Sequence, residues 1–315
     1  MAISDRSGPR VSIGLPVFNG ERYIGAAIDS ILAQDYQDFE LLLADNASTD
    51  ATLEICERAA ARDPRITVHR SAANRGAAWN YNRVVHLARG EYFKWAAHDD
   101  LLEPAFLRRC VEVLDRRPDV SLCYTRAVDI DEASTVVHAH ELPGYATAGR
   151  PHARVASVIL DPSPCMESFG LTRRRQLQQT SLIGGYTGSD RTLFLELALL
   201  GRFHEVPEVL FLHRQHAERS MNQYTDARAR NLWFDPSWQG RRSAPRWRLL
   251  REYVRATRRG TVRPGERAMV GLTLARWCAR NLRVLTREAA SFTLGNRTVV
   301  KPAQRATSAT TGSRT

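Results

Sequence analysis

The sequence predicts an α/β protein in which a mostly parallel central sheet is flanked by helices and followed by a basic helical extension. Two observations support this fold class. Apolar, β-branched runs alternate with helix-period segments from residue 11 to residue 130, and arginine-rich helical patterns follow residue 236. Strands that alternate with helices usually pair in parallel, with helices on both faces of the sheet.

Each expected element has a local signal. The run VSIGLPVF is apolar and ends at Asn19-Gly20, and FELLLADN is apolar throughout, as in a strand covered on both faces. The expected strands are 11–18, 39–46, 66–70, 91–97, 120–130 and 203–216. The expected helices are 21–33, 50–61, 76–88, one that starts at Pro104, 191–200, 245–259 and 266–288. Residues 138–170 are expected to form loops with one short helix, and 184–190 a flexible turn.

Acidic residues follow two of the expected strands. Asp45 comes at the end of the second strand, and Asp99 and Asp100 follow the apolar run EYFKWAA. In open α/β sheets, ligands bind beyond the carboxyl ends of the strands. The sequence therefore predicts a ligand-binding cleft at this edge.

The basic charge is concentrated in the C-terminal part. The net charge is +11, yet residues 236–315 hold 18 basic and 3 acidic residues, so that the remaining 235 residues carry a net −4. We expect a catalytic domain over 1–235, with a nucleotide-binding part at 10–131 and an acceptor part at 132–235. An Arg-rich helical extension over 236–302 and a disordered tail over 303–315 should follow.

The cysteines and the apolar runs predict the cellular location. Five cysteines without a CxxC pair argue against a disulfide framework or a zinc site and favour a reducing compartment. No apolar run reaches the ~20 residues that span a bilayer, and the first ten residues lack the apolar core of a signal peptide. We expect a cytoplasmic protein, and the basic C-terminal part allows a location at the inner face of the membrane.

Four motifs, spread over residues 10–216, resemble the family 2 glycosyltransferases, which have the GT-A fold with its Rossmann-like sheet. They are LPVFNGERYI with SILAQDYQDFELLLADNASTDAT, NRGAAWNYN, EYFKWAAHDDLLEP and GSDRTLFLELALLG. This family moves a sugar from a nucleotide-sugar donor. One departure is that Ala97 stands where many members have the first acid of an Asp-x-Asp motif.

The resemblance implies an inverting transferase that uses a UDP-, dTDP- or GDP-linked sugar, a hydroxyl acceptor and Mg²⁺ or Mn²⁺. It implies Asp190 as the general base, and Asp99 with His216 as metal ligands. The implied nucleotide-sugar-binding residues are Pro16, Phe18, Asn19, Glu21, Asp45, Asn74, Arg75, Gly76, Asn82, His98 and Asp99.

Each of the main assignments has a structural alternative. The pair Asp99-Asp100 can cap the next helix, Asp45 can belong to a helix-start turn, and Asp190 can begin a helix whose dipole favours an acid. Arg75 can be a solvated surface residue, and His216 a structural histidine. The protein can also be a non-catalytic nucleotide-sugar-binding protein or a sugar nucleotidyltransferase, although LPVFNGERY lacks the Gly-rich basic loop of the latter. A dinucleotide oxidoreductase is disfavoured because G-x-G-x-x-G is absent.

The basic C-terminal helices also allow alternatives. They can pack on the catalytic domain with a solvated basic face, or lie on an anionic membrane with Trp247 and Trp277 near the headgroups. Nucleic-acid binding is not expected, because no recognised module accompanies the charge.

Overall fold

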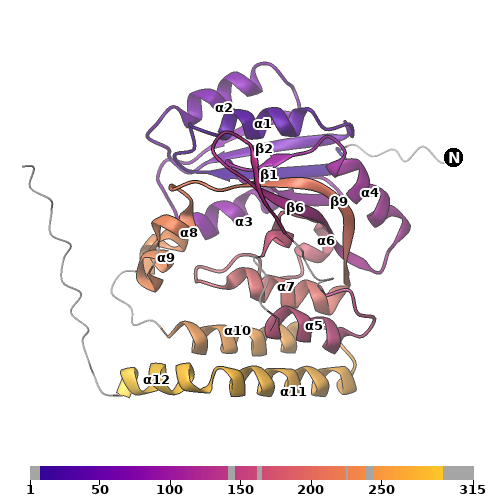
Figure 1. Ribbon diagram of the computed structural model, residues 1–315, viewed down its shortest axis with the longest axis vertical. Coiled ribbons are helices and arrows are strands. Elements are labelled where there is room, and N and C mark those ends of the chain that lie inside the picture. Colours follow the sequence, from indigo (N-terminus) through magenta and orange to yellow (C-terminus); the bar gives the residue numbers. More distant parts are fainter. Residues whose placement is uncertain (1–7, 141–145, 162–164, 225, 239–243, 294–315) are drawn as a thin grey trace, which may run out of the picture.

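The computed structural model describes residues 8–140, 146–161, 165–224, 226–238 and 244–293, arranged as one central sheet between layers of helices (Figure 1). The strands follow the order β3-β2-β1-β4-β8-β6-β9-β5, and β7 pairs with β6. The predicted tail at 303–315 lies outside the described residues.

Four strands form the parallel part of the sheet. Strand β1 (Val11–Val17) lies between β2 (Phe39–Asp45) and β4 (Tyr92–Trp95), and β3 (Ile66–Arg70) pairs with β2. Every residue of β1, β2 and β4 is buried, because helices cover both faces of this part. The expected α/β class and the helix-flanked sheet are confirmed.

The other part of the sheet contains antiparallel strands that the sequence does not signal. The long strands β6 (Val120–Ile130) and β9 (Arg202–Arg214) are parallel to each other. Three short strands pair antiparallel with their neighbours, namely β5 (Leu101–Leu102) with β9, β7 (Val136–Ala139) with β6, and β8 (Leu171–Arg173) with both β4 and β6.

Helices cover the two faces of the sheet with separate apolar cores. One core involves α1 (Ile24–Leu32), α2 (Thr52–Ala60) and α4 (Phe106–Arg116). The other involves α3 (Ala77–Leu87), α5 (Pro151–Leu160) and α7 (Ser189–Leu200). The remaining short elements are η1 (Met166–Phe169), α6 (Arg174–Leu177), α8 (Ser220–Gln223), α9 (Ala227–Phe234) and η2 (Pro236–Trp238).

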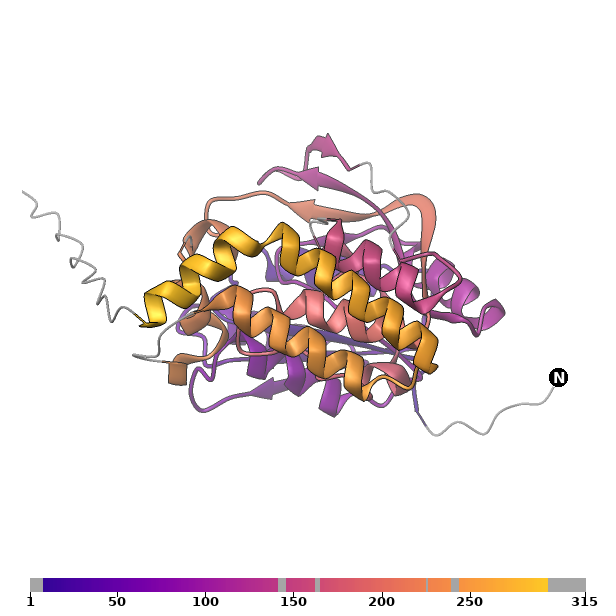
Figure 2. The ribbon, with the colours of Figure 1, turned by 90° about the horizontal axis from the view of Figure 1, so that it is seen from below.

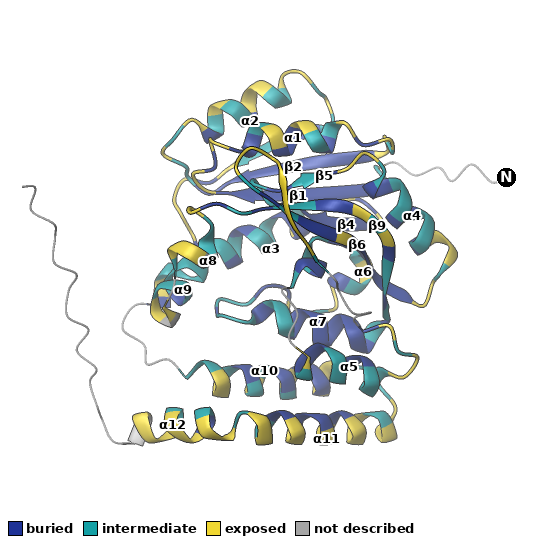
Figure 3. Ribbon diagram, in the orientation of Figure 1, coloured by how far each residue is buried: buried dark blue, intermediate teal, exposed yellow. Residues whose placement is uncertain are grey.

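The C-terminal helices add an outer layer to the second core (Figures 1 and 3). They are α10 (Pro245–Arg259), α11 (Pro264–Arg280) and α12 (Leu282–Thr293). The expected helix over 266–288 is thus two helices that meet at Asn281. Tyr253 of α10 and Trp277 of α11 pack edge to face with their ring centroids 5.6 Å apart, in the same apolar cluster as α7. The basic extension therefore shares its core with the rest of the molecule.

The parallel strands β1 to β4 place their carboxyl ends at one edge of the sheet, on the side where α8 and α9 lie (Figure 1). The parallel pair β6 and β9 has its own carboxyl ends, at residues 130 and 214. None of the described helices is long and apolar enough to cross a membrane.

Candidate active site

The two adjacent acids after β4 have opposite surroundings. Asp99 Oδ2 lies 2.9 Å from Nε2 of His216, and Asp99 Oδ1 lies 4.0 Å from Nδ1 of His98. Although burial opposes ionisation, the hydrogen bond from His216 and the nearby His98 lower the pKa of Asp99 to about 2. In contrast, burial and the neighbouring Asp99 raise the pKa of Asp100 well above its usual value. Asp99 is therefore the anion of the pair.

His216 approaches Asp99 from the segment that follows β9. Because the ionised Asp99 can only accept, His216 donates from Nε2. Its Nδ1 atom is buried without a hydrogen-bond partner in the described part of the chain, and so is the hydroxyl of Tyr23, whose ring centroid lies 4.8 Å away. Buried polar atoms without partners are rare in proteins. His216 Nδ1 can therefore take up the ring proton if a ligand displaces this proton from Nε2.

Arg214 holds the backbone around the two acids. It is 2% exposed, and its Nε donates to the carbonyl oxygen of Asp99 at 2.9 Å. Its other nitrogens donate to the loop after β6, through the carbonyls of Asp131 and Glu132 and the hydroxyl of Ser134. The backbone N–H of Arg214 donates to Asp100 Oδ1 at 2.9 Å. Arg214 thus joins the chain around Asp99 to the ends of β6 and β9.

A network of side-chain amides lies beyond the ends of β1 and β2. Asn46, which sequence reasoning missed, donates to Asn74 Oδ1 at 3.0 Å and accepts from the N–H of Arg75 at 3.0 Å. Gly76 has a φ of +86°, and a Cβ there would lie 2.5 Å from the carbonyl oxygen of Phe234, so only glycine fits. The structure therefore brings Asn74 and Gly76 together at this edge. The Asn74 side chain accepts a hydrogen bond from the N–H of Gly76 and so fixes the backbone of this turn.

Asp45 and Arg75 lie at the same edge and have partners of their own. Both carboxylate oxygens of Asp45 lie within hydrogen-bond distance of the N–H of Ser48, at 3.2 and 3.3 Å, as in the turn alternative. The Arg75 guanidinium lies 4.3 Å from the ring centroid of Trp79. Asp45 is 1% exposed, so a ligand reaches it only at the end of the strand.

The loop after β1 is bonded to the start of α2. Asn19 Oδ1 accepts from the N–H of Thr49 at 2.9 Å, and Glu21 Oε2 accepts from the N–H of Ala51, the residue before α2, at 2.8 Å. These bonds satisfy amides at the helix start. Pro16 lies buried within β1, and Phe18, 40% exposed, follows that strand. In this structure the polar side chains of Asn19 and Glu21 stabilise the loop.

Asn82 anchors the segment that leads to Asp190. Its side chain donates to the carbonyl of Ile183 at 2.9 Å and accepts from the N–H of Ile183 at 3.0 Å. Asp190 lies in the first turn of α7, where its Oδ1 accepts from the N–H of Arg191 at 2.9 Å. Burial and the adjacent Asp190 raise the pKa of the Cys165 thiol. Asn82 thus connects α3 to the loop before Asp190. Cys165 lies near Asp190, and no sequence signal indicates this contact.

A second group of potential ligands lies at the ends of β6 and β9. Asp129, His140 and His213 bring one ligand atom each within 4.8 Å of one another, so these residues can hold a metal ion. Asp129 Oδ1 lies 2.9 Å from His140 Nε2 and 2.8 Å from His213 Nδ1. Although burial opposes ionisation, these two histidines lower the pKa of Asp129 to about 2. Sequence reasoning missed Asp129 and His140.

The fold resembles that of solved glycosyltransferases of the GT-A class. S. aureus TarS, solved in complex with UDP-GlcNAc, has a TM-score of 0.64 and 16% identity, covering 90% of this chain and 76% of that chain. The mannosyltransferase PcManGT from Pyrobaculum calidifontis, in complex with GDP-Man and Mn²⁺, has a TM-score of 0.55 and 20% identity, covering 91% of this chain and 75% of that one. The chain therefore has the GT-A fold.

The sequence comparisons define the family. The model of glycosyl transferase family 2 matches residues 12–194, which is more than half of the chain, and the chain belongs to this family. The chondroitin synthase of Escherichia coli is 27% identical over 229 residues, which cover 71% of this chain and 31% of the relative. The chain spans 16%, 54% and 31% of the lengths of three curated relatives that it matches.

Proposed function

We propose that this protein transfers a sugar from a nucleoside-diphosphate sugar to a hydroxyl acceptor with inversion at the anomeric carbon. The observation that carries the proposal is the Asp99–His216 pair, 2.9 Å apart, beyond β4 in a family 2 fold. The nucleotide-sugar complexes of the structural neighbours TarS and PcManGT support a UDP-, dTDP- or GDP-linked donor.

We assign the divalent ion, Mg²⁺ or Mn²⁺, to Asp99 and His216. The Asp99 carboxylate and the His216 imidazole lie 2.9 Å apart, so both could contact one divalent ion if the proton on His216 Nε2 were displaced. Carboxylate and imidazole both suit Mn²⁺, and a Mn²⁺ complex of a neighbour supports this ion. When bound, the ion stabilises the charge that grows on the leaving diphosphate. With two protein ligands, positions stay open for phosphate oxygens.

The group of Asp129, His140 and His213 is a poorer candidate for this ion. A nitrogen of Arg219 lies 2.7 Å from His213 Nε2, and a guanidinium can only donate. Nε2 therefore accepts, and Nδ1 carries the proton that it donates to Asp129. A metal ion at Nδ1 would move this proton to Nε2 and displace Arg219, whereas at His216 the Nε2 proton can move to Nδ1, which has no hydrogen-bond partner among the described residues. We therefore place the catalytic ion at Asp99 and His216.

We assign the general base to Asp190. Its carboxylate accepts the proton of the acceptor hydroxyl as the oxygen forms a bond to the anomeric carbon. The bond from that carbon to the diphosphate oxygen breaks on the opposite side, and the nucleoside diphosphate leaves with the bonding electrons. The loop that Asn82 anchors positions Asp190 at the start of α7, where one of its carboxylate oxygens accepts a hydrogen bond from the backbone N–H of Arg191.

The test uses the full-length protein with Mn²⁺ and a panel of UDP-, dTDP- and GDP-linked sugars, and measures release of the nucleoside diphosphate. We expect turnover with at least one donor. Asp99→Asn should abolish both turnover and the Mn²⁺ dependence of nucleotide binding. Asp190→Asn should slow turnover by about 10²–10⁴-fold while calorimetry shows unchanged donor affinity.

Asp29→Asn is the matched control, because Asp29 lies exposed on α1, a helix at the far face of the sheet from α7. This variant should retain normal turnover. Equal nucleotide affinity with EDTA and with Mn²⁺ would refute the metal assignment. A product that keeps the anomeric configuration of the donor, observed by NMR, would refute the role of Asp190 as the base of a single displacement.

A further inference from the structure

The outer layer formed by α10, α11 and α12 carries positive charge that the described residues neutralise only in part, for example through the ion pair between Arg259 and Glu196 of α7. Residues 245–293 contain 12 Arg, 3 Glu and no Lys or Asp, a net charge of +9. All three acids already have partners, because Glu252 pairs with Arg251 and Arg255, Glu266 with His152, and Glu288 accepts from the N–H groups of Arg246 and Trp247. Figures 1 and 2 show that these helices form one outer face of the molecule.

The same layer exposes large apolar side chains. Of the eight large apolar side chains that are exposed in the described part of the chain, four lie here: Trp247 at 45%, Met269 at 41%, Leu272 at 54% and Leu282 at 59%. Exposed apolar groups gathered on one face indicate an interaction surface. A face that is both basic and apolar is unlike an ordinary solvated helix surface.

Helix α11 shows this combination most clearly. Its buried side chains are Val270, Thr273, Leu274 and Trp277, which pack on the core. At the opposite side, helical spacing places the exposed residues Ala268, Leu272, Ala275 and Ala279. Arg276 and Arg280 flank this apolar stripe and are also exposed. The outward side of the helix is thus apolar in the middle and cationic at its border.

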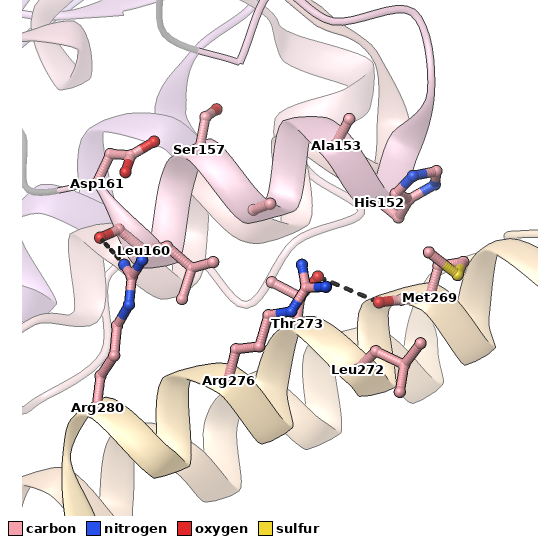
Figure 4. A pocket seen from close by; sticks show the side chains of 11 residues that line it. His152, Ala153, Ser157, Leu160, Asp161, Met269, Leu272, Thr273, Arg276 and Arg280 are labelled. Atoms are coloured by element: carbon pink, nitrogen blue, oxygen red, sulfur yellow. Dashed lines mark hydrogen bonds between the residues drawn. The ribbon is translucent and has the colours of Figure 1, made fainter.

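A pocket of about 390 Å³ lies beside this stripe, between α5 and α11 (Figure 4). Leu160, Met269 and Leu272 contribute apolar lining, and Arg276 and Arg280 line it with guanidinium groups. Arg280 donates to the carbonyl of Leu160 at 2.9 Å. Arg276 has no recorded ion pair among the described residues, so its charge is available to an anion.

We propose that the face of α10–α12 docks on an anionic lipid bilayer, with its guanidinium groups on lipid phosphates and Leu272, Met269 and Leu282 at the boundary with the acyl chains. Arginine suits this role because its planar fork binds phosphate through two hydrogen bonds. This inference goes beyond the proposed transfer reaction, since it concerns where the protein works.

Charge excludes two other occupants. Residues 294–315 of the chain carry four basic and no acidic residues, so they cannot neutralise the face. A second copy of the chain that packed with the same face would present the same positive charge and be repelled. Nucleic acid supplies phosphates, but it offers no apolar medium for the aliphatic side chains. A bilayer with anionic headgroups supplies both.

The test is flotation of the full-length protein with vesicles of phosphatidylglycerol and phosphatidylcholine, compared with vesicles of phosphatidylcholine alone. We expect binding to the anionic vesicles that weakens as salt increases. Substituting Arg276, Arg283 and Arg287 together by Gln should weaken binding about 100-fold, since each charge near the surface contributes about fivefold. Leu272→Gln with Leu282→Gln should weaken it by about tenfold or more.

The matched control replaces Arg58, Arg62 and Arg116 by Gln, because these exposed arginines lie on and beside α2 and α4, at the opposite face of the sheet. This variant should bind vesicles nearly normally. Release of nucleoside diphosphate should be the same in all variants. Loss of vesicle binding would therefore test the membrane proposal, and loss of this release would test the proposed transfer reaction. The proposal is overturned if the protein ignores anionic vesicles, if the α11–α12 variant binds like the control, or if oligonucleotides rather than vesicles show the charge-dependent binding.

Discussion

Lys94, in the strand that precedes Asp99 and Asp100, allows a quantitative test of the cost of burying an ammonium group. It lies in β4, is 1% exposed, and donates to the carbonyl of Phe169. Its ammonium lies 4.3 Å from the ring centroid of Phe106 and 5.6 Å from that of Phe211. No carboxylate forms a recorded ion pair with it in the described part of the chain. Burial lowers the pKa of Lys94 from 10.5 to about 7.

The change that we consider is Lys94→Met, which keeps an unbranched side chain that is one atom shorter and removes the charged ammonium. A pKa shift from 10.5 to about 7 corresponds to ~5 kcal/mol of destabilisation of the folded protein when the lysine is charged. At pH 7 about half of the folded molecules have a deprotonated Lys94, so the destabilisation by its charge falls to ~4 kcal/mol. The variant loses the bond to Phe169, at a cost of ~1–3 kcal/mol. We therefore expect Lys94→Met to be more stable by ~1–3 kcal/mol at pH 7.

The sign of the pH dependence follows from proton binding. Between pH 7 and pH 10.5 the unfolded state binds more protons at Lys94 than the folded state, so the stability of the unsubstituted protein rises with pH in this window. The advantage of the variant is largest below pH 7 and disappears above pH 10.5. Urea unfolding should show that this advantage is ~3 kcal/mol greater at pH 6 than at pH 9.

Arg62→Met is the control, because Arg62 is exposed and its replacement introduces the same side chain without changing a buried charge. It should show little difference between the two pH values. If Lys94→Met is less stable than the unsubstituted protein at pH 6, or if its advantage is equal at pH 6 and pH 9, the reasoning about the buried ammonium is wrong.

Two further predictions concern the candidate site. His216→Asn should weaken the Mn²⁺-dependent binding of a nucleoside diphosphate by at least about tenfold. Calorimetry should show unchanged binding of the nucleotide without metal. If the Mn²⁺ affinity is unchanged, His216 is a structural residue. Asn82→Ala removes both bonds to Ile183 and should cost ~1–2 kcal/mol of stability, with faster amide hydrogen exchange at Ile183 and a larger increase in KM for the acceptor than for the donor. Equal effects on both KM values would contradict an acceptor-side role for this loop.

Most of the long elements are predictable from the sequence because their signal is local. The apolar run of β2 and the helical spacing of α10 are visible over seven and fifteen residues, and their observed bounds agree closely with the expected ones. Strands β5 and β8 have two and three residues, too few to show a period. β8 is defined only by its place between β4 and β6, which depends on the whole fold.

The candidate site was predictable in part. The resemblance indicated Asp99 and His216, which are 117 positions apart, and the structure brings them into contact. It also indicated Asn19 and Glu21, whose side chains the structure shows bonded to the start of α2. Arg214 was missed, because a sequence does not show that an arginine is buried. The sequence HRQH offers only a weak signal, a basic residue between two histidines at the end of a strand.

The adjacent acids Asp99 and Asp100 are compatible with an apolar strand because the fold gives them different charges. Two carboxylates side by side in a buried place cannot both ionise without a large cost. His216 stabilises the anion on Asp99, whereas Asp100 is buried with the N–H of Arg214 and its pKa is raised. The pair therefore carries one negative charge, and Ala97 adds none. If Asp99 and His216 held the proposed divalent ion, their single negative charge would leave the ion most of its positive charge, which would help to stabilise a leaving diphosphate.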